Sequence, residues 1–130
     1  MFLKTYLVAL LIFLAIDMVW LTIIAKDFYK KHIGFLMNET VNITPAVIFY
    51  VLFVLALVVF VITPSIEKNS WVNALMFGAF FGLVTYATYD LTNHATLKNW
   101  PLIVTLVDLA WGAFIGSAVS VITFFIISKI

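Results

Sequence analysis

The chain has 130 residues, of which 65% are apolar and 10% are charged. A soluble domain of this size needs a polar surface, and this composition cannot supply one. The net charge of +1 gives no reason to expect nucleic-acid binding, and the lack of cysteine excludes disulfides, thiolate metal sites, Fe–S clusters and thiol nucleophiles. We therefore expect a membrane protein with the lipid bilayer as its main partner.

Four apolar stretches are long enough to cross a bilayer, which takes about 20 helical residues. They cover residues 2–24, 45–63, 71–90 and 101–127. The first is too long for a typical signal peptide and has no small-residue cleavage pattern after it, so we interpret it as a retained span. The predicted fold is a single all-α domain over residues 1–130, with four transmembrane helices in an antiparallel bundle. Its expected location is the cell inner (plasma) membrane, as a multi-pass protein.

Four spans place both termini on one side of the membrane, here called face A, and the loops around residues 25–43 and 92–100 on the other, here called face B. Face B carries one lysine more than face A, so the positive-inside rule favours face B as cytoplasmic. From Lys26 to Met37, apolar residues and lysines alternate with the spacing of a short amphipathic helix on the face-B surface. A simple extension of the first span is the alternative.

Small residues recur every four positions on the third and fourth spans. The two stripes are Ala74, Gly78 and Gly82, and Gly112, Gly116 and Ser120. Such stripes let membrane helices approach closely, so we expect these two helices to cross tightly. A hinge or a groove for a lipid chain is the functional alternative. The second span has no such stripe, and we expect it to face lipid for much of its length.

Three aspartates lie inside or at the ends of the predicted spans: Asp17, Asp90 and Asp108. A carboxylate in a bilayer costs a few kcal/mol, about 3 on insertion scales, so such residues face the bundle interior and usually have a task. From a helical rise of about 1.5 Å per residue, Asp17 and Asp108 each lie roughly 10 Å from face B. Asp90 ends the third span close to the same face.

Further polar and aromatic residues share this half of the membrane, whereas the other half is nearly free of them. The sequence therefore predicts a polar, aromatic pocket that is open toward face B and closed toward face A. Its predicted ligand-binding residues are Asp17, Trp20, Tyr50, Tyr86, Tyr89, Asp90, Asn93, Thr105, Asp108 and Trp111.

The pattern Asp-x-x-Trp occurs twice, at Asp17–Trp20 and at Asp108–Trp111, on helices that run antiparallel. The repetition fits an inverted repeat, and chance is the alternative.

No span interior contains a basic residue, so three aspartates cannot all stay ionised cheaply at close range. Three alternatives remain: the aspartates are protonated or hydrogen-bonded, they bind a cation, or they are solvated by a water-filled cavity or by polar groups of the loops. No cofactor is predicted, and a divalent cation such as Mg²⁺ is the metal that carboxylates would hold. His94 is a candidate for proton relay or metal binding, with a solvated loop histidine as the alternative.

The run Tyr86-Ala87-Thr88-Tyr89-Asp90-Leu91-Thr92-Asn93, followed by Trp100-Pro101 and by Asp108 with Trp111-Gly112, resembles the DUF2177 family of bacterial membrane proteins. The resemblance covers the whole chain. It implies a small polytopic membrane protein and implies no activity.

Three functions fit these features. The first is binding or transport of a small amphiphilic or cationic molecule, with or without coupling to protons. Transport through only four helices would need a homodimer. The second is a membrane enzyme that acts on a lipid or isoprenoid by acid–base chemistry, with Asp17, Asp90, Asp108 and His94 as its catalytic candidates. The third is an accessory subunit in which the aspartates only hold helices together.

Overall fold

Four long apolar helices make up the computed structural model, which describes residues 1–130. In chain order they are α1 (Phe2–Val19) with the π-helical turn η1 (Trp20–Ile24); α3 (Ile43–Leu57) with the π-helical turn η3 (Val58–Ile62) and α4 (Thr63–Glu67); α5 (Trp71–Thr96); and α6 (Leu102–Lys129). Each of the four is long and apolar enough to span a membrane. The predicted all-α fold with four spans is confirmed.

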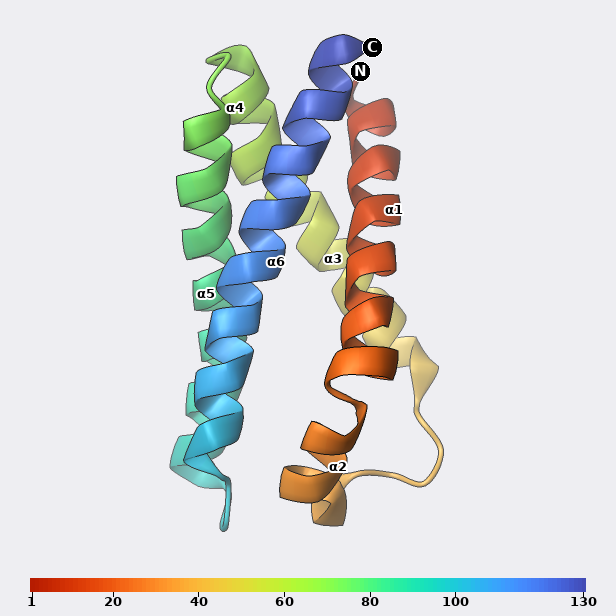
Figure 1. Ribbon diagram of the computed structural model, residues 1–130, viewed down its shortest axis with the longest axis vertical. Coiled ribbons are helices and arrows are strands. Elements are labelled where there is room, and N and C mark those ends of the chain that lie inside the picture. The colour runs from red at the N-terminus through yellow and green to blue at the C-terminus, as the bar shows by residue number, and fades with distance from the viewer.

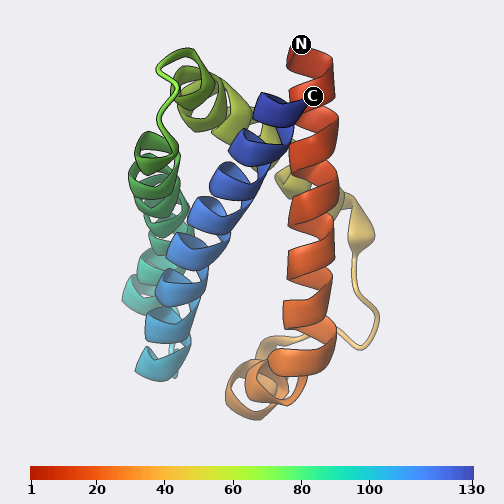
Figure 2. The ribbon, with the colours of Figure 1, turned by 45° about the horizontal axis from the view of Figure 1, so that its top comes forward.

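Both termini lie at one end of the molecule, and the helix between the first and second spans lies at the other (Figure 1). Consecutive long helices therefore run antiparallel, and the two ends correspond to faces A and B. Near face A, α1 lies close to α6, and the two helices diverge toward face B in both ribbon views (Figure 2). The α3 helix slants behind them, from the α5 side near face A to the α1 side near face B (Figure 1).

The connection at face B contains the predicted short helix, α2 (Lys26–Ile33), followed by a 3₁₀ turn, η2 (Gly34–Leu36). At Ala25 the backbone leaves helical geometry, with φ −105° and ψ 4°, so α2 is a separate element and does not extend α1. Lys30 and Lys31 on α2 are exposed, which suits a helix at the membrane surface.

Two helices extend beyond the predicted ends of their spans. The α5 helix runs to Thr96 instead of ending at Asp90, because residues 91–96 include neither glycine nor proline. The second span continues through Pro64 to Glu67. A proline ring clashes with the carbonyl group four residues earlier, and the wider π-helical turn η3 contains that residue, Phe60.

The tightest contact in the molecule is the crossing of α5 and α6, where the two stripes of small residues face each other. A Cβ atom added to Gly82 would lie 1.9 Å from the carbonyl oxygen of Gly112, and one added to Gly116 would lie 2.2 Å from the carbonyl oxygen of Gly78. Only glycine allows the two backbones to approach this closely.

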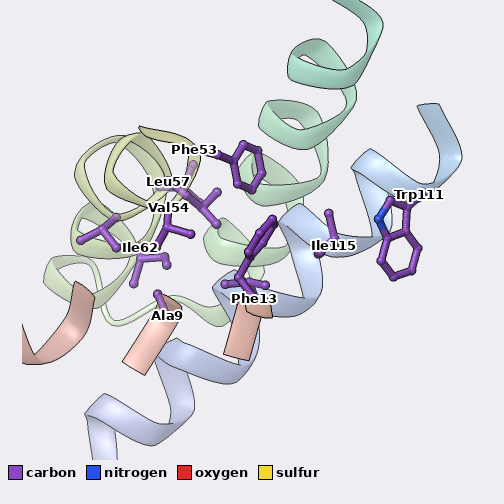
Figure 3. Close-up of a cluster of buried hydrophobic side chains, with 11 residues drawn as sticks. Ala9, Phe13, Phe53, Val54, Leu57, Ile62, Trp111 and Ile115 are labelled. Carbon is purple, nitrogen blue, oxygen red and sulfur yellow. The ribbon is translucent and has the colours of Figure 1, made fainter. Parts of the chain in front are cut away.

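The largest cluster of buried apolar side chains joins α1, α3, η3 and α6 (Figure 3). Its members are Ala9, Phe13, Phe53, Val54, Leu57, Val58, Val61, Ile62, Trp111, Ile115 and Val119. More of them come from the second span than from any other. One side of this span therefore packs in the core, while much of the rest is exposed, as expected for a span that faces lipid for much of its length. An all-apolar sequence does not reveal which face is buried, because it lacks a polar stripe.

Candidate functional site

A pocket of about 540 Å³ lies in the face-B half of the bundle, between the core cluster and α2. Its lining comes from every long helix and from α2: Asp17, Trp20, Leu21, Tyr29, Pro45, Ala46, Phe49, Tyr50, Thr85, Tyr86, Tyr89, Asp108 and Trp111. The volume falls in the range of small-molecule sites, about 300–1,000 Å³. Asp17 and Asp108 contribute the two carboxyl groups of this lining, which includes no lysine or histidine.

Aromatic contacts close the pocket toward face A. The ring of Phe13 packs edge-on against Tyr50, with centroids 5.2 Å apart, and lies 5.4 Å from the ring of Phe53. Near face B, by contrast, α3 slants away from α5, and Phe49 and Tyr89 on these two helices are exposed. The lining therefore reaches the surface of the bundle near face B.

The buried Asp17 carboxylate is held by groups from two other helices. The Trp111 indole Nε1 donates a hydrogen bond to Asp17 Oδ1 at 3.3 Å, and the Tyr50 hydroxyl lies against the same carboxylate. Asp17 is 4% exposed. Its neighbours supply hydrogen-bond donors and no positive charge, so a cation that entered the pocket would meet an uncompensated carboxylate.

The two Asp-x-x-Trp motifs meet face to face. The indole rings of Trp20 and Trp111 are stacked, with centroids 4.3 Å apart and an interplanar angle of 9°. Trp20 Nε1 donates to the Tyr29 hydroxyl at 3.2 Å, and this hydroxyl donates to Asp108 Oδ1. Each tryptophan thus connects to the aspartate of the other motif, Trp111 directly and Trp20 through Tyr29.

Tyr29 is the contribution of α2 to the site. Burial raises the pKa of its phenol, and the neighbouring Asp108 carboxylate raises that pKa further. The hydroxyl therefore stays protonated at neutral pH and can donate to Asp108 while it accepts from Trp20. This link joins the surface helix α2 to the transmembrane helix α6.

Asp90 is more deeply buried than the sequence predicted. It was expected near the surface at the end of a span, whereas it is 0% exposed and lies within α5. Neither of its carboxyl oxygens has a hydrogen-bond donor among the other side chains or the backbone. Its carboxyl group lies against that of Asp108, which separates it from the pocket. The continuation of α5 to Thr96 explains the burial, because more than a turn of helix follows Asp90.

Three other predicted residues lie outside the pocket lining. Trp100 Nε1 donates to the buried Thr105 Oγ1 at 3.0 Å, and the His94 Nδ1 atom lies 3.3 Å from the same oxygen. Asn93 is half-buried in the last turns of α5. His94 belongs to this helix and not to a loop, and the structure does not bring it into the pocket.

The structure brings together seven of the ten predicted ligand-binding residues in the pocket lining, namely Asp17, Trp20, Tyr50, Tyr86, Tyr89, Asp108 and Trp111. Tyr29 and Phe49 also line it and were not predicted. Both are aromatic residues near face B, the signal that identified the others, but the position of Tyr29 depends on how α2 folds back. No group of three or more histidine, aspartate and glutamate side chains is arranged to hold a metal ion, and the divalent-cation site stays a prediction.

Four apolar spans and an intramembrane carboxylate pocket define a multi-pass membrane protein. Residues 2–125 match a family described as predicted membrane protein, DUF2177. The chain belongs to this family, which confirms the resemblance seen in its sequence. Comparisons with curated proteins and with solved structures give no match.

Proposed function

We propose that the protein binds a small amphiphilic organic cation in the pocket between α1, α2, α3, α5 and α6. The observation that carries the proposal is the lining itself, where two carboxyl groups and a stacked pair of tryptophans occur without any basic side chain. Aromatic faces attract cations, and the attraction strengthens when the site is desolvated.

Electrostatics favours a cation over a neutral ligand. An unpaired carboxylate in a low-dielectric site is costly, and a bound positive charge offsets that cost. The Asp17 carboxylate meets donors from Trp111 and Tyr50 that orient it but leave its charge uncompensated. A quaternary or protonated amine between Asp17 and Asp108 would contact both carboxyl groups and the aromatic walls.

The form of the pocket favours an amphiphile. Its lining is mostly apolar, and it includes exposed side chains at the surface of the bundle, where a ligand can arrive from the lipid. Toward face A, the core cluster fills the space between the helices. This supports binding within the face-B half of the bundle in preference to passage through it.

The test is a set of melting temperatures in mild detergent with benzyltrimethylammonium as the probe. A ligand that binds only the folded state raises the melting temperature by mass action. We expect the probe to stabilise the wild type, and to lose most of this effect in the folded variant Asp17→Asn. The matched control is Asp27→Asn, which removes an exposed carboxylate on α2 and should keep the full shift.

Two results would count against the proposal. One is a wild type that no concentration of the probe stabilises. The other is an equal shift in the wild type and in folded Asp17→Asn, which would show that the carboxylate takes no part in binding. If Asp17→Asn unfolds and the probe does not stabilise the wild type, Asp17 only holds helices together, as expected for an accessory subunit.

A further inference from the structure

Resting on the proposed cation site, we propose that Asp90 and Asp108 share one proton in the unliganded protein and release it when the cation binds. Binding would then be an exchange of one organic cation for one proton. Asp90, which holds the proton together with Asp108, does not line the pocket and would not contact the cation.

The helix register places the two carboxyl groups together. In the antiparallel crossing of α5 and α6, Gly78 faces Gly116 and Gly82 faces Gly112. Two helical turns beyond Gly82, the same register sets Asp90 opposite residue 104 of α6, one helical turn from Asp108. The carboxyl groups of Asp90 and Asp108 accordingly lie within hydrogen-bonding reach of each other.

The contact between the two groups requires a proton. Asp90 is 0% exposed, and neither of its oxygens receives a hydrogen bond from a backbone or side-chain donor. Two ionised carboxylates in contact, without a donor or a cation between them, repel each other strongly in a desolvated site. One proton between them removes the repulsion and supplies the hydrogen bond that Asp90 otherwise lacks.

Few other ionisable groups lie near the pair. They are tyrosines and one histidine, which is the single basic group among them. On α2, the Tyr29 hydroxyl donates to Asp108. On α5, Tyr86 and Tyr89 precede Asp90, and His94 follows it with its ring directed to Thr105 on α6. Asp108 supplies the one carboxyl group in contact with Asp90.

The cation connects the pocket to this proton. Asp108 faces the pocket on one side and Asp90 on the other. A positive charge beside Asp108 stabilises the doubly ionised pair, so the O–H bond of the shared carboxylic acid breaks and the proton passes to water at face B. The pair gains one negative charge, the cation brings one positive charge, and the net charge of the site is unchanged.

The experiment is a calorimetric titration of the detergent-solubilised protein with benzyltrimethylammonium, in two buffers of different ionisation enthalpy. The difference in apparent heat between the buffers gives the number of protons released per cation. We expect one proton for the wild type, and an affinity that rises about tenfold per pH unit while the pair holds its proton. Asp27→Asn, the matched control, should release one proton as well.

Asp90→Asn distinguishes this proposal from the proposed cation site. Its amide can donate to Asp108, which then stays ionised without a proton, so we expect binding with no proton release and no dependence on pH. Cation binding by the wild type with the same heat in both buffers would overturn the exchange and leave the cation site standing. A wild type that binds no cation at any pH would overturn both. If Asp90→Asn fails to fold, the wild-type titrations still decide the question.

Discussion

Replacing Gly82 by alanine tests the tightest contact in the bundle. The added Cβ atom would lie 1.9 Å from the carbonyl oxygen of Gly112. The optimal separation of non-bonded heavy atoms is about 3.5 Å, so the two backbones would have to separate by roughly 1.5 Å. Overpacking typically costs about 1–3 kcal/mol, and a backbone clash belongs at the upper end because no side chain can turn away. The higher helix propensity of alanine offsets up to about 1 kcal/mol of this cost.

We therefore expect Gly82→Ala to lower the free energy of unfolding by about 2 kcal/mol, as measured by titration with a denaturing detergent in mixed micelles. Gly34→Ala is the matched control, because its Cβ would meet only a flexible lysine side chain at 3.8 Å. It should change stability little. A Gly82→Ala variant as stable as the wild type, with an unchanged control, would refute the close crossing of α5 and α6.

Two further predictions concern hydroxyl groups. Tyr29→Phe removes the hydroxyl between Trp20 and Asp108 and should lower the free energy of unfolding at pH 8 by about 1–2 kcal/mol. Because the pKa of Tyr29 is raised by folding, its contribution is complete below about pH 10, the ordinary tyrosine pKa, and is lost as pH rises further. The deficit of Tyr29→Phe should shrink above pH 10, and a constant deficit would contradict this. Thr123→Val removes a buried hydroxyl without a partner and should be neutral or stabilising, whereas Thr105→Val removes the acceptor of Trp100 and should cost about 1–2 kcal/mol. The reverse order of stability would contradict the hydrogen bonding described here.

Some features of the site follow from the sequence because they depend on depth along a helix. The rise per residue places Asp17 and Asp108 at one level, and the level alone predicts that they share a half of the membrane. Residues three apart share a face, so Trp20 and Trp111 accompany their aspartates into the pocket. The architecture likewise follows from four apolar stretches of sufficient length.

Other features depend on where separate segments meet, which periodicity does not encode. Tyr29 reaches Asp108 because the chain bends at Ala25 and α2 turns back under the bundle. Asp90 is buried because α5 continues past it, a boundary that is hard to place when no glycine or proline marks the end. The inner face of α3 was missed because Val, Leu and Phe occur all around that helix.

The proposed cation site requires that the pocket select a positive charge, and a comparison of two ligands of nearly equal shape tests this requirement. Benzyltrimethylammonium and its neutral carbon isostere, neopentylbenzene, can be titrated against the intrinsic fluorescence of Trp20 and Trp111, which line the pocket. We expect the cation to bind at least about tenfold more tightly, which corresponds to about 1.4 kcal/mol and lies within the range of a desolvated cation–π contact. Equal affinity for the two compounds, or tighter binding of the neutral one, would contradict it.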